Sequence, residues 1–182
     1  MRGPEQLVTE NFAFFDTALG RCGIVWTDRG VSGVQLPEAS EAATRARLLR
    51  GHPRASEAEP DADVRRVIDG IAALLRGSRV DLSDVALDMD EVPAFHRRVF
   101  DVARTIPVGR TITYGELAAR LGDPGSARAV GEALGRNPFP IVVPCHRVLA
   151  ASGKLGGFSA HGGAETKRRM LLIEGALIEL AL

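Results

Sequence analysis

The stretch Ile141-Val142-Val143-Pro144-Cys145-His146-Arg147-Val148 places a cysteine beside a histidine after an apolar, β-branched run. The run 141–143 is typical of a short buried strand, and Pro144 ends it because proline has no N–H for a ladder. Cys145 and His146 are therefore expected where a strand gives way to a turn. A thiolate next to a general base is a strong nucleophile at neutral pH. The alternative is a small buried thiol that only packs, beside a surface imidazole. The sequence around the pair decides between these two interpretations.

The composition is that of an ordinary soluble globular protein, with 45% apolar and 25% charged residues in a chain of 182. No apolar run approaches the ~20 residues of a membrane span, and the N-terminus lacks the apolar core of a signal peptide. The two cysteines, Cys22 and Cys145, give neither a disulfide framework nor a Cys-x-x-Cys metal signature. We expect a cytoplasmic protein with Cys22 packed inside a strand, and no metal or cofactor.

The two halves of the chain carry opposite net charge. Residues 92–182 contain 12 Lys and Arg against 7 Asp and Glu, a net charge of +5, which leaves −5 for residues 1–91. Such a split indicates two parts with different partners. We therefore predict an N-terminal α/β domain over 1–91 and a C-terminal domain over 92–182. A net charge of +5 makes the second half only mildly basic, well below the charge that by itself would indicate nucleic-acid binding.

The acidic half is predicted to be a small α/β unit with an antiparallel sheet and no catalytic constellation. Alternating apolar residues between glycine-containing turns predict the strands, and apolar residues at helical spacing predict the helices. The expected strands span 12–19, 22–27, 30–36 and, at the sheet edge, 80–87. The expected helices span 38–49 and 61–76, with a polar loop over 56–63.

The basic half is predicted to be mostly helical, which makes the fold class α/β (α+β). The expected helices span 93–104, 113–121, 127–134 and 165–175. Thr113 and Glu116 match a capping box at the start of the second of these. The second and third helices, joined by a tight Gly/Pro turn, resemble a helix-turn-helix.

The second helix of that pair carries small residues and one arginine. Ala127 and Gly131 allow close approach to a backbone or groove without reading a sequence, and Arg128 adds a positive charge. A helix of this composition can contact DNA or can simply pack against its neighbour. The residues alone leave both interpretations open.

Residues on both sides of Cys145 extend the candidate site. Upstream, the Asn137 amide can brace the turn, or Asn137 can form an ordinary Asn-Pro turn. Pro140 is one of two prolines in three residues, which make the chain beside the nucleophile rigid. Downstream, the glycines between 152 and 163 indicate a loop that closes over a ligand with main-chain groups. Lys167 is expected to be exposed on the last helix. Glu174, at the end of that helix, opposes the helix dipole, so a partner such as His146 explains it better than helix stability.

From about Phe95 to Gly175 the chain resembles the O6-alkylguanine-DNA alkyltransferases, which repair DNA by direct reversal. The resemblance is carried, in order and with little change in spacing, by Thr113-Tyr114, Ala127-Arg128-Ala129-Val130-Gly131, Asn137-Pro138, Pro144-Cys145-His146-Arg147-Val148, Ser152-Gly153 and Glu174-Gly175. The acidic half is similar only in the order of its strands and helices.

The resemblance implies an irreversible, stoichiometric transfer of the alkyl group from O6-alkylguanine in double-stranded DNA to Cys145, with O4-alkylthymine as a second candidate substrate. The target nucleotide must be rotated out of the stack, at a cost of a few kcal/mol. The helix with small residues would lie in the minor groove, and Arg128 would fill the gap in the stack. The protein is expected to act as a monomer, without a cofactor and away from membranes.

The resemblance also implies the catalytic roles. Cys145 would be the nucleophile and permanent acceptor. His146 would take the thiol proton through a water molecule and be oriented by Glu174. Asn137 would brace the turn that carries Cys145.

The substrate contacts implied by the resemblance lie on several elements. The Tyr114 hydroxyl would donate to guanine N3 and the Ser159 N–H to O6, and both contacts stabilise the anion that forms as the C–O bond breaks. The main-chain carbonyls of Cys145 and Val148 would read the exocyclic amine. Ala127 and Gly131 would meet the DNA beside Arg128, and Pro140 would line the pocket.

The sequence departs from the family at three places. Phe158 stands where a tyrosine is usual, Ala160-His161 are inserted before Gly162-Gly163, and the N-terminal zinc site of some relatives has at most Cys22 here. The first two departures affect the reach of the loop and the size of alkyl group accepted.

Two other functions remain as alternatives. One is a lesion-binding protein without transfer, which the acceptor Cys145 argues against. The other is a thiol hydrolase, for which the helix pair would have no purpose.

Overall fold

The sheet of the N-terminal half forms one layer of the molecule. The computed structural model describes residues 8–177. The strands are β1 (Asn11–Thr17), β2 (Gly20–Thr27), β3 (Gly30–Gln35) and β4 (Ser56–Glu57), in the order β3-β2-β1-β4. The first three form the predicted antiparallel meander, whose turns use Gly20 and Gly30 at φ values of 124° and 134°. β4 pairs parallel with β1 inside the stretch predicted as a polar loop.

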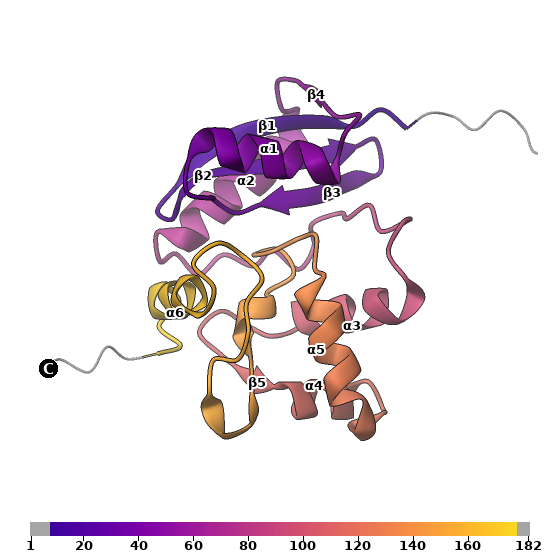
Figure 1. Cartoon of the computed structure of the whole chain (residues 1–182), viewed down its shortest axis with the longest axis vertical. Helices are drawn as coiled ribbons and strands as arrows, with labels where there is room; N and C mark the ends of the chain where they lie inside the picture. The colour runs from indigo at the N-terminus through magenta and orange to yellow at the C-terminus, as the bar shows by residue number, and fades with distance from the viewer. Residues whose placement is uncertain (1–7, 178–182) are drawn as a thin grey trace, which may run out of the picture.

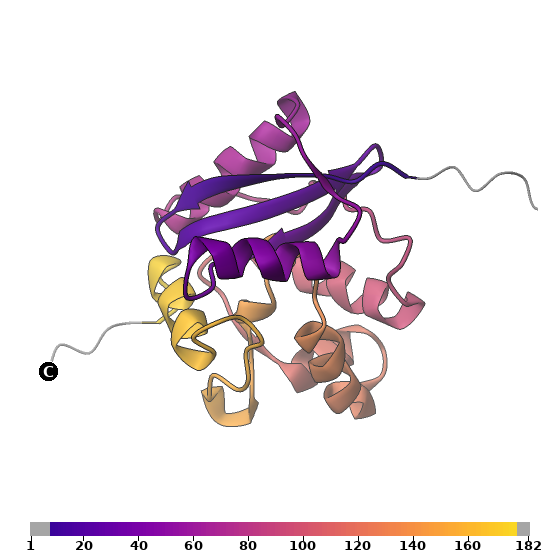
Figure 2. The same ribbon diagram turned by 45° about the horizontal axis from the view of Figure 1, so that its top comes forward.

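Two helices cover opposite faces of this sheet (Figures 1 and 2). They are α1 (Glu41–Gly51) and α2 (Ala62–Leu75), capped by the side chains of Ser40 and Asp61. Because strand side chains alternate between faces, Phe12 packs with Leu48 of α1, whereas Ile24 belongs to the cluster that includes Ile71 of α2. Cys22 is fully buried on the α2 side, which confirms its packing role.

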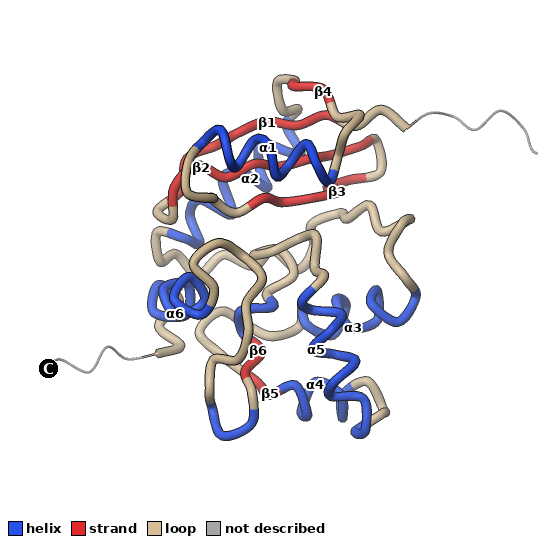
Figure 3. The backbone as a smooth tube through the Cα atoms, in the orientation of Figure 1, coloured by secondary structure: helices blue, strands red, loops and turns tan. Residues whose placement is uncertain are grey.

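The second half forms a mainly helical layer below the sheet (Figure 3). Its helices are α3 (Ala94–Arg104), α4 (Tyr114–Arg120), α5 (Ala127–Gly135) and α6 (Ala164–Ile173), and its two short strands are β5 (Ile112–Thr113) and β6 (Val148–Leu149). A 3-10 turn over Pro124–Ser126 joins α4 to α5, as expected for a helix-turn-helix. The predicted capping box is present: the Glu116 N–H donates to Thr113 Oγ1 at 3.1 Å, and the Thr113 N–H donates to Glu116 Oε2 at 2.6 Å.

The two layers share one hydrophobic core, which reaches from Trp26 of the sheet to Phe100 of α3 and Phe139. A backbone hydrogen bond also joins the two layers, from the Val34 N–H to the Pro138 carbonyl at 2.8 Å. The fold class, with an antiparallel-rich sheet first and helices after it, is confirmed. The domain division at 91/92 stays a prediction. None of the described helices is long and apolar enough to cross a bilayer.

Two predicted strands are wrong. Residues 141–143 are buried as expected but form a turn, with Ile141 at φ 76° and only an isolated bridge between Pro140 and Val143. A positive φ breaks the extended backbone, and the flanking prolines cannot donate to a ladder. Residues 80–87 are mostly irregular, and only Leu87 forms an isolated bridge, with Val31.

Candidate active site

Cys145 begins the 3-10 turn Cys145–Arg147, at the end of the buried 141–143 turn. Asn137 ties that turn together. Its Nδ2 donates to the Val143 carbonyl at 2.9 Å, and its Oδ1 accepts the Phe139 N–H at 2.9 Å. The amide thus supplies donor and acceptor to a backbone that cannot form a strand, so the position of Cys145 depends on Asn137.

His146 and Glu174 form a buried pair, as the helix-dipole argument predicted. Nε2 of His146 lies 2.8 Å from Oε1 of Glu174, and the two residues are 0% and 5% exposed. Arg147 completes the group with two hydrogen bonds to the same carboxylate, each 2.9 Å long, and a third at 2.6 Å to the Ile106 carbonyl. Arg147 had no predicted role, because a buried arginine reveals itself only through its partners.

This arrangement fixes the charge and tautomer of His146. Although burial raises the pKa of Glu174, hydrogen bonds from His146 and Arg147 lower it to about 2, so Glu174 stays ionised. Burial lowers the pKa of His146 against the opposing effect of Glu174, so the imidazole is neutral at pH 7. An ionised carboxylate accepts the Nε2 proton, which leaves Nδ1 as the unprotonated nitrogen. Nδ1 is buried and has no hydrogen-bond partner among the described residues.

Lys167 was predicted to be exposed, and this is wrong: it is 0% exposed. Its Nζ donates to the Val148 carbonyl at 2.6 Å and lies 5.8 Å from the centre of the Tyr114 ring. A long side chain can bury its charge when a carbonyl and an aromatic face receive it. Burial raises the pKa of the Cys145 thiol, against the lowering effects of the Asn137 amide and the Lys167 charge. The resting thiol is therefore protonated, with a positive charge nearby.

A pocket of about 380 Å³ brings Cys145 together with three of the predicted contact residues, Tyr114, Gly131 and Ser159. A pocket of this size is within the range used for small-molecule groups. The Tyr114 ring faces Gly131, where a Cβ would sit 3.8 Å from it. The β5–β6 ladder places the start of α4 beside Val148. The Ser159 N–H donates to no acceptor among the described residues.

The other predicted residues lie outside this pocket. Arg128 and Ala127 are in the first turn of α5, with Arg128 exposed and making no polar contact with another described residue. Pro140 lines a second crevice, which also opens onto Cys145 and runs toward α1. The site therefore joins the helix-turn-helix to the nucleophile from one side and the sheet layer from the other.

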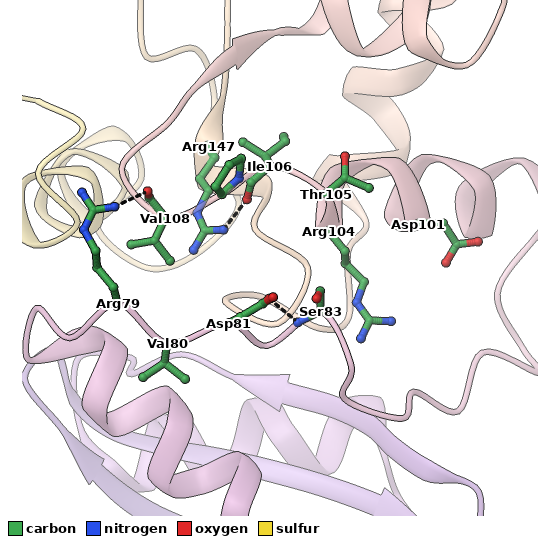
Figure 4. A pocket seen from close by; sticks show the side chains of 11 residues that line it. Arg79, Val80, Asp81, Ser83, Asp101, Arg104, Thr105, Ile106, Val108 and Arg147 are labelled. Carbon is green, nitrogen blue, oxygen red and sulfur yellow. Dashed lines mark hydrogen bonds between the residues drawn. The ribbon is translucent and has the colours of Figure 1, made fainter.

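Behind Arg147 lies a further cavity of about 480 Å³ between α3, the 79–83 segment and residues 106–108 (Figure 4). Arg147 and Arg79 each donate to a carbonyl in its wall, those of Ile106 and Val108. The bond to the Ile106 carbonyl fastens the outer end of the Arg147 side chain, so Glu174 meets a guanidinium that is already held in place. Within the described residues, no group of three or more His, Cys, Asp or Glu side chains could hold a metal ion.

Comparison with known proteins agrees with this geometry. The family model for the 6-O-methylguanine DNA methyltransferase, DNA binding domain, matches residues 94–176. A methylated-DNA–protein-cysteine methyltransferase from Methanothermobacter thermautotrophicus is 38% identical over 157 residues, 86% of this chain and 81% of the relative. One from Mycobacterium tuberculosis is 47% identical over 107 residues, 59% of this chain and 62% of the relative.

Solved structures match the whole fold. The crystal structure of Mycobacterium tuberculosis OGT in complex with DNA has a TM-score of 0.73 at 33% identity, covering 91% of this chain and 93% of that one. The O6-methylguanine-DNA methyltransferase from Pyrococcus kodakaraensis has a TM-score of 0.69 at 27% identity, covering 92% and 99%. Because the Methanothermobacter relative aligns over most of both chains, this chain belongs to the methylated-DNA–protein-cysteine methyltransferase family.

Proposed function

We propose that this protein repairs DNA by moving the alkyl group of O6-alkylguanine irreversibly onto Cys145, once per molecule. The observation that carries the proposal is the pocket that sets Cys145 against Tyr114 and the small residue Gly131 of the helix-turn-helix. A nucleophile reached through a DNA-binding helix fits chemistry on a base that has been rotated out of the duplex. Two buried free cysteines suit a reducing cytoplasm, where we place the reaction.

The transfer is an in-line displacement at the alkyl carbon. The bond from Cys145 Sγ to that carbon forms as the carbon–O6 bond breaks, and the electron pair of the broken bond stays on the guanine. A water molecule passes the thiol proton to Nδ1 of His146. Because burial keeps the thiol protonated at rest, this proton transfer is required before or during attack.

The departing guanine is stabilised by groups that are already in position. The Tyr114 hydroxyl donates to N3 and the Ser159 N–H donates to O6, where negative charge develops. Lys167 places a positive charge near both the thiolate and the Tyr114 ring. The Val148 carbonyl accepts from Lys167 and keeps a second lone pair for the exocyclic amine of guanine.

DNA is bound on the exposed face of α5. Ala127 and Gly131 permit close approach to the minor groove, and Arg128 is free to enter the stack in place of the flipped nucleotide. Contacts of this kind select a deformable or damaged site without reading a base sequence, which is the selectivity that a repair protein needs.

Mass spectrometry of the intact protein tests the proposal. After incubation with a duplex that contains one O6-methylguanine, the mass should rise by one CH₂ unit, located at Cys145, and restored guanine should never exceed protein. Cys145→Ser should bind the duplex and show no mass change. Binding without a mass change in the wild type would indicate a lesion-binding protein, and many turnovers per molecule would indicate a thiol hydrolase.

Replacing Lys167 with methionine should slow methyl transfer about tenfold, equivalent to about 1.4 kcal/mol of lost electrostatic stabilisation. Methionine fills the same space without the charge that lowers the pKa of Cys145. The rate is measured in a single turnover, and the pH dependence of Cys145 alkylation by iodoacetamide should move to higher pH. The other thiol does not interfere, because burial raises the pKa of Cys22 to about 11. An unchanged rate would remove Lys167 from the mechanism.

A further inference from the structure

The glycine-rich loop (152–163) that covers Cys145 has little support from its own backbone. Within the described chain, residues 155–159 make no backbone–backbone hydrogen bond, and the nearest ones lie at Lys154 and Ala160. The loop nevertheless lines both openings onto Cys145 with Phe158 and Ser159. Something other than main-chain pairing must hold Ser159 where its N–H can meet a substrate.

Two residues of the sheet layer contact this loop, in addition to Thr166 of α6, whose Oγ1 donates to the His161 carbonyl at 2.6 Å. Arg47, on α1, extends Nη2 to the Ser159 carbonyl at 3.5 Å. His161, one of the two inserted residues, lies with Nδ1 3.7 Å from Oε2 of Glu38. In Figure 2, α1 lies directly above the loop that leads into α6.

Glu38 connects these two contacts. Its Oε1 is 3.3 Å from Arg47 Nε, and its side chain is only 15% exposed, so the carboxylate is held between α1 and the loop. Gln35 donates to the same oxygen at 3.4 Å, and the Glu38 N–H donates to Thr44 Oγ1 at 3.0 Å. The carboxylate is therefore fixed from its own layer before it meets the loop.

We infer that Glu38, Arg47 and His161 form an interlayer clamp by which the N-terminal half positions the glycine-rich loop over Cys145. Arg47 is the positioning residue, because among residues 8–177 it alone joins the Glu38 carboxylate to the Ser159 main chain. The inference rests on the proposed function, in which the Ser159 N–H meets the departing guanine. It also gives the acidic half a part in the reaction that the sequence did not indicate.

The clamp depends on the planar, forked shape of the Arg47 guanidinium. Arg47 offers Nε to Glu38 and Nη2 to Ser159 in one rigid group, so fixing one end fixes the other. The contact between Arg47 Nη2 and the Ser159 carbonyl is long at 3.5 Å, and hydrogen bonds around a reaction centre are often long before the substrate is in place. A clamp of this type affects the rate of transfer more than the affinity for DNA, because Arg47 belongs to α1 and not to the helix-turn-helix.

The test compares Arg47→Met with Arg45→Met, both in single turnover over a range of duplex concentrations. Arg45 is on the same helix and pairs with Glu57 at 2.8 Å, on a different element from the loop. Arg47→Met should lower the maximum transfer rate about tenfold, less than the roughly hundredfold that a misplacement of 1 Å can cost. The duplex concentration at half-maximum rate should stay within about twofold of wild type. Arg45→Met should leave both values unchanged.

A second readout needs no DNA. Lys154 is exposed just before the unsupported segment, so trypsin cleavage after Lys154 reports how firmly the loop is held. Cleavage there should be faster in Arg47→Met and Glu38→Gln than in Arg45→Met. The double variant Glu38→Gln/Arg47→Met should be no slower in transfer than Arg47→Met alone, because the residues act as one unit.

The outcomes separate the two proposals. A wild type that transfers no methyl group overturns the proposed function, and the cleavage comparison still decides whether Arg47 holds the loop. Equal cleavage and equal rates in Arg47→Met and Arg45→Met overturn the clamp. A slower rate accompanied by a large rise in the half-maximum concentration also overturns it, because Arg47 would then be a DNA contact.

Discussion

Replacing Glu174 with glutamine is expected to lower the free energy of unfolding by about 3–5 kcal/mol at neutral pH, the range found when one partner of a buried ion pair is removed. The Glu174 carboxylate accepts hydrogen bonds from His146 Nε2 and twice from Arg147. A neutral amide leaves the buried guanidinium without a counter-charge and presents an NH₂ group to neighbours that are themselves donors. The replacement keeps the shape of the side chain, so the loss reports charge and hydrogen bonding and not a cavity.

Urea unfolding at pH 7 measures this change. Glu165→Gln is the matched control, because Glu165 lies on the same helix and its carboxylate makes an exposed contact of 3.5 Å with Arg168. The control should stay within about 0.5 kcal/mol of wild type. A Glu174→Gln protein as stable as the control would show that the buried group contributes nothing net to folding.

The unfolding free energy of Glu174→Gln should depend on pH less than that of wild type as the solution becomes acidic. The pKa of Glu174 is lowered from 4.5 to about 2 in the folded protein. A lowered folded pKa gives stability that is complete above the unfolded value and is lost as pH falls from about 4.5 toward 2. Wild type should lose this contribution over that window, and Glu174→Gln has no such contribution to lose. The difference in unfolding free energy between the two should therefore shrink as the pH is lowered.

Local features of the sequence predicted the parts of the site that local chemistry determines. The capping box at Thr113 and Glu116 forms within four residues, so its two hydrogen bonds follow from spacing alone. The pairing of Glu174 with His146 was predicted for a different reason. A carboxylate at a helix C-terminus is unfavourable without a partner, and a buried imidazole supplies one.

The failures have a common physical origin in contacts between distant residues. Lys167 looks like a surface residue of α6 until the Val148 carbonyl, nineteen positions away, is placed beside it. The run 141–143 has the β-branched composition of a strand, and the bonds from Asn137 hold it in a turn instead. Glu38 and Arg47 reach Ser159 and His161 only because the sheet layer lies over the helical one. Periodicity and motif spacing carry no information on such contacts.

The rate of methyl transfer is expected to fall in acid, with a midpoint below pH 6.5, the ordinary value for histidine. Burial lowers the pKa of His146, while Glu174 raises it, and Arg147 and Lys167 lower it further. The neutral imidazole that accepts the thiol proton therefore persists to a lower pH than in an exposed histidine. Above the midpoint the rate should be level until the thiol begins to ionise by itself, at a pH that burial has raised.

Single-turnover rates in the wild type and in His146→Gln test this expectation. The variant should be slower by about 10²–10⁴-fold at neutral pH, the usual contribution of a positioned general base, and should lack the acid step. His96→Gln is the control, because His96 is on α3, outside both crevices that open onto Cys145. It should keep the wild-type profile. A wild-type rate that is level from acid to neutral pH would contradict the role of His146, since protonation of the base must stop the transfer.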